Sequence, residues 1–244
     1  GQLYSRVAPW LNLANLAHLI AGVPRFVRDY ATYRRLEPVP LRDLYPMLLD
    51  WYESAGVASG HYFHQDLWTS RKVFASGVRS HVDVGSRVDG FVAQCAVFAR
   101  VTYVDVRPLP PVANVVSVAA TVTALPFADA SLQSLSCLHV LEHIGLGRYG
   151  DPIDPAGTRR GCAELVRVLA PGGHLYVGIP MGRERVCFNA HRVHAPATVI
   201  QYFRDVTLEE SAVVDDRGNL HDPADPLSFA AADYSCALLH FRKS

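Results

Sequence analysis

Histidines that could act as general bases lie in two segments of the second half of the chain. His143 follows the apolar segment Leu135–Leu138, and His191 follows the segment His174–Ile179. Imidazole titrates near neutral pH, so either side chain could remove a proton from a reacting hydroxyl. We expect His143 to be the base and His191 the second choice, with Glu142 as a further catalytic candidate.

Polar side chains suited to a hydroxyl-bearing acceptor surround these histidines. Some stand in a Gly/Pro-rich loop that begins at residue 145, and others accompany His191. Two more, Gln65 and Asp66, lie in an aromatic-polar segment, and we expect them on a lid because packing in a core would not need them. The predicted substrate-binding residues are Tyr149, Asp151, Asn189, Arg192, His194, Gln65 and Asp66.

A glycine turn further upstream could bring a ligand close to the backbone. The segment Asp83-Val-Gly85-Ser86 follows a β-branched run and precedes a stretch with helical spacing. Glycine lacks a Cβ atom, and the first turn of a helix offers unpaired N–H groups. Asp105 stands twenty residues beyond Gly85, a spacing at which an acid can accept both ribose hydroxyls of a nucleoside. The pattern G-x-G-x-x-G, typical of NAD sites, is absent.

The string His139-x-x-Glu142-His143 has the form of a zinc-peptidase motif. In that class the string lies within a long helix, whereas here it follows a predicted strand. We therefore expect neither a peptidase nor a bound metal. A divalent ion held by Glu142 and His143 is the less favoured alternative.

Alternating strands and helices would position these groups. Between Ser80 and Arg204, short apolar runs typical of strands alternate with segments in which apolar residues recur at helical spacing. This alternation predicts an α/β fold with a parallel sheet covered by helices on both faces. Ligands of such sheets bind beyond the carboxyl ends of the strands. The predicted strands are Val82–Val84, Val101–Val106, Val115–Ala119, Leu132–Leu138, His174–Ile179, Val206–Val214 and Ala232–Phe241, and the predicted helices among them are Gly90–Arg100, Pro155–Leu169 and Ala195–Phe203.

The first 75 residues are predicted to form a helical extension or lid, and residues 76–244 the main domain. Apolar residues from Trp10 to Ile20 recur at helical spacing, Pro24 suits the start of a second helix, and further helices are expected over Leu41–Tyr52 and Tyr62–Ala75. Packing of this amphipathic start on the main domain is the favoured interpretation, and peripheral contact with a membrane surface is the alternative.

Composition excludes several classes of protein. Half of the residues are hydrophobic and the formal net charge is zero, which argues against a disordered chain and against a nucleic-acid partner. No apolar run is long enough to span a membrane. The five cysteines are unevenly spaced, so we expect core residues in a reducing cytoplasm rather than disulfides: Cys95, Cys137, Cys162, Cys187 and Cys236.

The order of these segments resembles that of class I S-adenosylmethionine (SAM) methyltransferases, over roughly residues 80–241. The resemblance rests on the acid-x-Gly turn, the acid that ends the second strand, "LPF" at Leu125, "LEH" at Leu141 and "L-x-P-G-G" from Leu169. It implies a seven-stranded Rossmann-like sheet with an antiparallel last strand, and SAM as cofactor. The cofactor-binding residues it implies are Asp83, Gly85, Ser86, Gly90, Asp105, Val106, Ala124, Leu125 and His139.

Two departures from the family pattern keep other functions open. The usual G-x-G-x-G turn is replaced by Gly85-Ser-Arg-Val-Asp-Gly90, and Thr121 stands near the place of an acid that precedes "LPF". We expect O-methylation of a small-molecule or glycan hydroxyl. The alternatives are a non-catalytic scaffold with the same fold and, less favoured, a nucleotide-sugar or NAD enzyme.

A narrower resemblance extends upstream to about residue 25. The strings "HYFHQDLW", "LEHIGLGRYGDPIDP" and "FNAHR" are similar to a bacterial family of methyltransferase-like proteins of unknown function. Proteins of this kind tend to accompany glycan-assembly enzymes, which is the reason for expecting a sugar hydroxyl. The oligomeric state is left open.

Overall fold

The computed structural model describes residues 13–244, with side chains from residue 16 onward, and forms two compact units, Gly1–Val57 and Ala58–Ser244. We placed the boundary after residue 75, at the end of helix α3 (Gly60–Ala75). The structure instead includes α3 in the second unit, because the buried face of this helix packs on the sheet. Trp10, the start of the predicted apolar helix face, lies outside the described residues.

In its described part, the first unit consists of helix α2 (Leu13–Leu36) and a return segment. His18 stacks on Tyr52 with ring centroids 4.0 Å apart, and the Arg25 guanidinium lies 4.5 Å from the centre of the Trp51 ring. One face of α2 therefore contacts residues about 30 positions further along the chain. Among residues 13–244, no helix combines the length and the apolar character needed to cross a bilayer.

Two differences from the predicted helices of this unit involve prolines. Pro24 lies inside α2 and does not begin a second helix. The predicted helix Leu41–Tyr52 is reduced to two single 3-10 turns, Leu41–Asp43 and Asp50–Tyr52. Pro46 lies between these turns; it lacks an N–H donor and disfavours the helical conformation of the residue before it.

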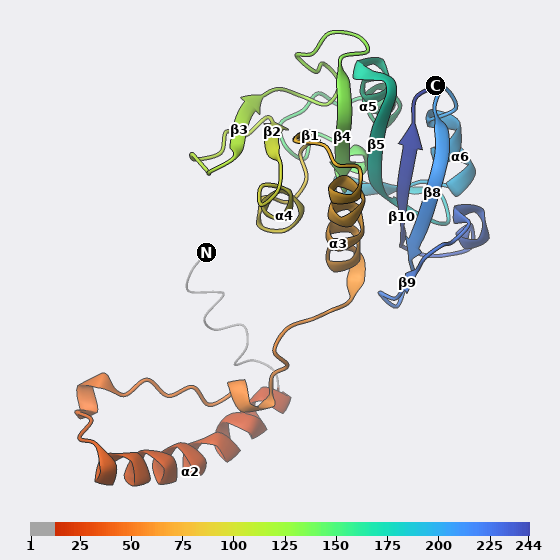
Figure 1. Cartoon of the computed structure of the whole chain (residues 1–244). Helices are drawn as coiled ribbons and strands as arrows, with labels where there is room; N and C mark the ends of the chain where they lie inside the picture. Colours follow the sequence, from red (N-terminus) through yellow and green to blue (C-terminus); the bar gives the residue numbers. More distant parts are fainter. Residues whose placement is uncertain (1–12) are drawn as a thin grey trace. The chain divides into compact units, whose positions relative to one another are not determined.

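An eight-stranded sheet organises the second unit, with the strand order β3-β2-β1-β4-β5-β10-β8-β9 (Figure 1). The five strands from β3 to β5 are parallel, and β10 runs antiparallel to both of its neighbours. The predicted antiparallel last strand is thereby confirmed. The strands are β1 (Ser80–Val84), β2 (Arg100–Asp105), β3 (Val115–Ala119), β4 (Leu132–Leu138), β5 (Leu169–Met181), β8 (Thr207–Val214), β9 (Leu220–His221) and β10 (Ser235–Arg242).

The predicted number of seven strands was wrong by one. The extra strand is β9, which pairs antiparallel with β8 at the edge of the sheet. Asp215 makes this hairpin possible, because its carboxylate accepts hydrogen bonds from the backbone N–H groups of Arg217 and Asn219. A two-residue strand leaves too short an alternating pattern for detection in the sequence.

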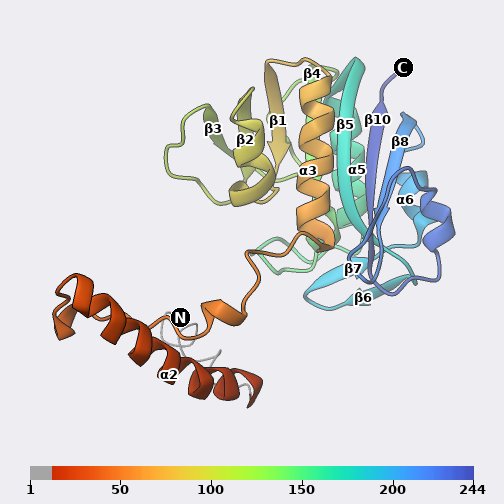
Figure 2. The same ribbon diagram turned by 60° about the horizontal axis from the view of Figure 1, so that its bottom comes forward.

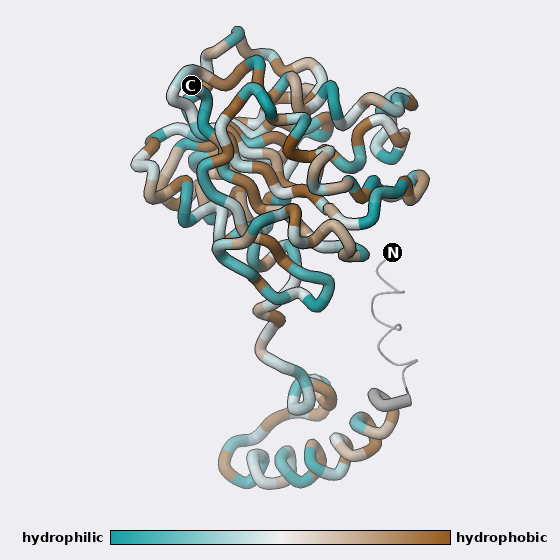
Figure 3. The backbone as a smooth tube through the Cα atoms, turned by 90° about the vertical axis from the view of Figure 1, so that its right-hand side faces the viewer, coloured by the Kyte–Doolittle hydropathy of each residue, from teal (hydrophilic) through white to brown (hydrophobic). Residues whose placement is uncertain are grey.

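Helices cover both faces of the sheet, as predicted (Figure 2). On one face, α3 and the short α4 (Ala93–Cys95) enclose an apolar cluster that includes Val73, Phe91 and Tyr176. On the other face, α5 (Gly157–Val168) and α6 (Pro196–Tyr202) cover the larger cluster, which contains Leu165. Many hydrophobic segments of the second unit run through its interior (Figure 3).

Two local structures differ from the sequence-based prediction. The expected helix Gly90–Arg100 is a π-helical turn (Val88–Val92) followed by α4. The segment after β5, for which the sequence predicts neither a strand nor a helix, contains a small hairpin of β6 (Arg185–Cys187) and β7 (His191–Val193).

All five cysteines are free, in agreement with the sequence analysis. Four of them are fully buried in the core, and Cys187 on β6 is half-buried. The thiols therefore contribute to packing rather than to cross-links.

Candidate active site

A cavity of about 790 Å³ opens at the carboxyl ends of β1, β2 and β4. Its walls include Gly85 after β1, Asp105 at the end of β2 and His139 after β4. A neighbouring cavity of about 430 Å³ shares these three residues and has a more apolar wall with Val106 and Thr121. In the strand order, β1 stands between β2 and β4, so the cavities lie at the switch point where open α/β sheets bind ligands.

The backbone of the β1 turn requires glycine. Gly85 has φ +72°, and a Cβ atom there would lie 3.0 Å from a methyl group of Val140 and 3.8 Å from an Asp105 carboxylate oxygen. The Gly85 N–H donates to the carbonyl of Val104, 2.9 Å away. The absence of a side chain therefore keeps open the space between the turn and the end of β2.

Hydrogen bonds to the buried Asp83 carboxylate hold this turn in place. Its carboxylate accepts hydrogen bonds from the hydroxyls of Ser86 and Ser136 at 2.6 and 2.5 Å, and from the Ser86 N–H at 3.0 Å. The Ser86 hydroxyl in turn accepts from the Leu138 N–H at 3.1 Å. Burial raises the pKa of Asp83 to about 6, although the hydrogen bonds from the two serines oppose the shift. The polar atoms of Asp83 and Ser86 are thus used within the protein, to hold β1 against β4.

Asp105 reaches the cavity but already has a cationic partner. Its two carboxylate oxygens each accept a hydrogen bond from the Arg107 guanidinium at 2.9 Å, and Oδ2 also accepts from the Tyr103 hydroxyl at 3.1 Å. Burial acts to raise the pKa of Asp105, but the bonds from Arg107 outweigh it and lower the pKa. Asp105 is therefore an ionised acceptor at the cavity wall.

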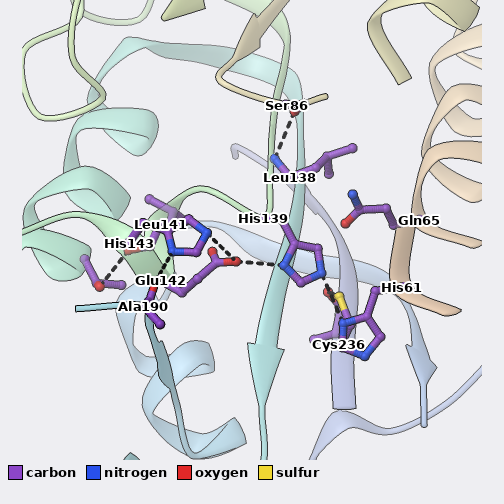
Figure 4. A network of polar contacts seen from close by, with 12 residues as sticks. His61, Gln65, Ser86, Leu138, His139, Leu141, Glu142, His143, Ala190 and Cys236 are labelled. Atoms are coloured by element: carbon purple, nitrogen blue, oxygen red, sulfur yellow. Dashed lines mark hydrogen bonds and ion pairs between the residues drawn. The ribbon is translucent and has the colours of Figure 1, made fainter. Parts of the chain in front are cut away.

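His139, Glu142 and His143 form a network after β4, in which His139 and Glu142 are buried (Figure 4). The His139 Nδ1–H donates to Glu142 Oε1 at 2.7 Å, and the same oxygen lies 3.7 Å from His143 Nε2. Burial acts to raise the pKa of Glu142, but the neighbouring His139 outweighs it and lowers the pKa. The pKa of His139 is raised, because Cys236 and Glu142 outweigh the effect of burial. Glu142 is thus a buried carboxylate that orients the His139 imidazole and lies close to the His143 ring.

His143 and His191 both reach the rim of the larger cavity, as their positions after β4 and β5 predicted. The His143 Nδ1–H donates to the carbonyl of Ala190 at 2.7 Å, which leaves Nε2 as the nitrogen without a hydrogen. Tyr149 contacts the His143 ring edge-on, with centroids 5.8 Å apart. His191 lies beside Tyr234, and burial lowers its pKa.

Several predicted site residues lie elsewhere. Gln65 and Asp66, expected on a lid, are both buried; a Cβ atom at Gly178 of β5 would lie 2.6 Å from Gln65 Oε1, and one at Gly90 would lie 2.0 Å from Asp66 Oδ2. Gly90 is thus explained by the approach of this carboxylate, whose pKa burial raises to about 6. The Leu125 N–H donates to Glu164, and residues 120–123 rather than Ala124 and Leu125 line the smaller cavity.

Of the predicted substrate-binding residues, some line the two cavities and others do not. Tyr149 and Asp151 line the cavities, and Asp151 also accepts the Gly145 N–H at 2.6 Å. Arg192 is buried and donates to the carbonyls of Ile144 and Asp154, so it holds a loop. His194 is buried beside Tyr202, and Asn189 is exposed; neither lines the two cavities.

The structure adds residues that the sequence analysis missed. Tyrosines and arginines dominate this set, and two arginines lie over one tyrosine ring: Arg107 and Arg148 are 4.9 and 5.2 Å from the centre of Tyr149. Tyr62 comes from α3, and Tyr234 directly precedes β10, so no sequence spacing links them to the turn. The additional residues that line the larger cavity include Tyr62, Arg87, Tyr103, Arg107, Arg148 and Tyr234.

Solved structures with similar folds are methyltransferase-like proteins. The N-methyltransferase NodS from Bradyrhizobium japonicum WM9, in complex with S-adenosylhomocysteine, is 20% identical with a TM-score of 0.51, covering 81% of this chain and 91% of that chain. YcgJ from Bacillus subtilis is 13% identical with a TM-score of 0.51, covering 74% of this chain and 99% of that chain. The chain therefore has the class I methyltransferase fold.

This methyltransferase fold is also found in a protein with another described activity. The [4+2]-cyclase SpnF is 16% identical with a TM-score of 0.50, covering 77% of this chain and 88% of that chain. The fold alone therefore leaves the reaction to be argued from the site.

A family described as a Caenorhabditis protein of unknown function, DUF268, matches residues 124–205. We expected a bacterial family, so that part of the prediction was wrong. The matched segment includes the "LPF", "LEH" and "PGG" motifs that position the end of β4 and the start of β5. The search of curated proteins gave no match.

Proposed function

We propose that this protein is a SAM-dependent methyltransferase that methylates a hydroxyl of a small molecule or glycan. The observation that carries the proposal is that Asp105 and Gly85 lie side by side in the wall of one cavity at the switch point of a methyltransferase-type sheet. An ionised acceptor beside a glycine turn suits a ligand with ribose hydroxyls. A Cβ atom at Gly85 would lie 3.8 Å from Asp105 Oδ2, so glycine keeps a side chain away from this acceptor.

Residues of the β1 and β2 ends would hold the adenosyl group. Asp105 would accept hydrogen bonds from the ribose hydroxyls after Arg107 turns away, and Val106 and Thr121 would contact the base in the smaller cavity. Arg107 can turn because 63% of its side chain is exposed. Gly85 and the backbone that Asp83 and Ser86 hold in place would face the methionine portion.

Aromatic rings favour a cationic ligand in the larger cavity. When bound, SAM supplies an electrophilic methyl group on a sulfonium ion. Tyr62 and Tyr234 line this cavity next to His139, and faces of aromatic rings attract cations. These rings would therefore orient the charged centre toward the end of β4.

We assign His143 as the base that accepts the proton of the acceptor hydroxyl. Its Nδ1–H is fixed on the Ala190 carbonyl, and the Glu142 carboxylate, 3.7 Å from Nε2, would stabilise the imidazolium once formed. His191, on the same rim, stays the second choice. Tyr149 and Asp151 would contact the acceptor from the loop that follows.

A non-catalytic scaffold is the alternative, and the Asp105–Arg107 ion pair is the observation that favours it. If Arg107 permanently occupies the ribose-binding carboxylate, the protein does not bind the cofactor. Titration calorimetry with S-adenosylhomocysteine separates the two. Binding with a Kd below about 100 µM supports the methyltransferase, whereas an absence of binding by the folded protein contradicts it.

A second experiment would address the acceptor. The purified protein would be incubated with methyl-labelled SAM and a panel of hydroxyl, amine and thiol acceptors. Label in a hydroxyl product supports O-methylation. Label only in amine or thiol products would retain the methyltransferase and reject the acceptor class.

A further inference from the structure

Three metal-ligand side chains from distant parts of the second unit meet beside the larger cavity (Figure 4). His61 comes from the first turn of α3, His139 from the end of β4, and Cys236 from β10. One ligand atom of each lies within 4.8 Å of the other two. His61 Nδ1 and His139 Nε2 are 3.2 Å apart.

The separation of the two imidazole nitrogens fits a shared metal ion. Two nitrogen ligands at about 2.0–2.1 Å from a tetrahedral zinc ion are about 3.3–3.4 Å apart. Without a metal, the two imidazoles can share one hydrogen at 3.2 Å, and the Cys236 thiol can donate to the Ala237 carbonyl at 3.6 Å. A metal ion would instead account for the meeting of all three ligand atoms at one point. Two nitrogens and one sulfur are a ligand set that zinc accepts.

The surroundings of His139 strengthen the assignment. Its second nitrogen, Nδ1, donates to the buried carboxylate of Glu142 at 2.7 Å, which leaves Nε2 to face His61 and Cys236. A carboxylate behind a histidine in this way is the common arrangement in zinc sites, because it fixes the ring and raises its basicity. His139 also has φ +56°, a conformation few non-glycine residues adopt, and its N–H donates to the Gly178 carbonyl at 2.8 Å.

We propose that His61, His139 and Cys236 bind one zinc ion, with Glu142 as the carboxylate that orients His139. Cys236 is fully buried, while His61 is half-buried and lies with Tyr62 and Tyr234 in the wall of a hollow of about 600 Å³. The fourth coordination position would therefore open toward this hollow, where a water molecule or a coordinating atom of an acceptor could occupy it. The proposal does not depend on the methyltransferase assignment, since zinc binding is measured without turnover.

A second cluster in the same unit, His174, Glu209 and His240, offers an internal comparison. Here the two imidazoles are only 2.9 Å apart, Glu209 is partly exposed, and His240 already contacts Glu210 at 3.2 Å. The contacts of this cluster are explained by hydrogen bonds between neighbouring strands. It therefore supplies a matched histidine control.

The experiment measures zinc on the full chain. Protein stripped with a chelator is titrated with Zn²⁺ in competition with a chromophoric chelator. We expect one equivalent to bind with a Kd below about 1 µM. Cys236→Ser and His61→Gln should weaken binding at least about a hundredfold, and Glu142→Gln about ten- to a hundredfold.

The controls are Cys187→Ser, which removes the half-buried thiol of β6, and His240→Gln, which breaks the comparison cluster. Both should bind zinc like the unmodified protein. Unchanged binding in Cys236→Ser and His61→Gln, or loss of the site in His240→Gln, would overturn the proposal.

Cobalt substitution keeps the test decisive if Cys236→Ser fails to fold. Co²⁺ bound to the unmodified protein should give the visible absorption of a tetrahedral ion and a near-ultraviolet thiolate-to-cobalt band. Absence of the thiolate band with one equivalent of Co²⁺ bound would refute the assignment of Cys236 as a ligand.

Discussion

The Arg107 guanidinium donates two parallel hydrogen bonds to the Asp105 carboxylate, each 2.9 Å long. The carboxylate is buried at the end of β2, whereas 63% of the Arg107 side chain is exposed. The ion pair thus joins a fixed acceptor to a movable donor. A ligand that needs Asp105 must displace Arg107, so the two residues should have opposite effects on affinity.

Replacing Asp105 with Asn should weaken binding of S-adenosylhomocysteine about ten- to a hundredfold, because a charge-assisted acceptor is lost. Titration calorimetry measures the effect. The exposed Asp205 on the same unit provides the control, and Asp205→Asn should leave the affinity unchanged. If Asp105→Asn folds and binds as tightly as the unmodified protein, Asp105 does not contact the ligand.

Arg107→Ala should strengthen the same binding roughly three- to tenfold, since the ligand no longer has to break a bidentate ion pair. The comparison uses the same titration, at low and at high salt. The gain should shrink at high salt, where screening already weakens the pair. A loss of affinity would instead make Arg107 a ligand-binding residue.

Gly85→Ala should abolish measurable binding while the chain stays folded. The new Cβ lies 3.0 Å from Val140 in the cavity wall, and φ is +72°. Gly172 is the matched control: it has the same φ, and no atom lies within 4 Å of its added Cβ. Gly172→Ala carries the same backbone cost, about 1 kcal/mol, and should bind normally. Equal affinities of the two variants would place the ligand away from the turn.

Asp83→Asn should change how stability depends on pH. Burial raises the pKa of Asp83 from 3.8 to about 6, so the folded chain binds an extra proton between these values. Asp83 therefore makes the free energy of unfolding fall as the pH rises through this window. The free energy of unfolding of the unmodified protein minus that of Asp83→Asn should be largest near pH 4. At pH 7 this difference should be smaller by about 2–3 kcal/mol.

His81, on the same strand, tests the sign of this effect. Burial lowers its pKa from 6.5 to about 3, so the unfolded chain binds the extra proton between these values. His81 makes the free energy of unfolding rise with pH, and His81→Gln should remove that rise. Urea unfolding of the three proteins from pH 4 to 7 measures both trends. Parallel pH profiles for all three would contradict the buried titrations.

His143→Ala should keep the affinity for S-adenosylhomocysteine but lower methyl transfer to a hydroxyl acceptor about 10²–10⁴-fold. His191→Ala should stay within roughly threefold of the unmodified rate if His143 is the base. Single-turnover rates with the acceptor from the labelling experiment measure this. If neither variant slows turnover, neither histidine is the base.

The sequence by itself determined the layered sheet and the edge at which the site lies. Apolar periods and turn residues are local signals, and they placed Asp105 and Gly85 at the ends of adjacent parallel strands. The carboxyl ends of parallel strands lie at the same edge of the sheet. The proximity of these two residues could therefore be predicted without knowledge of the side-chain packing. His143 and His191 were brought to the same rim for the same reason.

Only the tertiary structure decided what each side chain contacts. Packing of α3 against the sheet buried Gln65 and Asp66, which polarity alone placed on a surface. The same packing brought His61 next to His139, 78 positions away in the sequence. Such contacts depend on how whole helices and strands pack against one another in three dimensions. They result from many weak interactions between residues far apart in the chain, so no local pattern of the sequence reveals them.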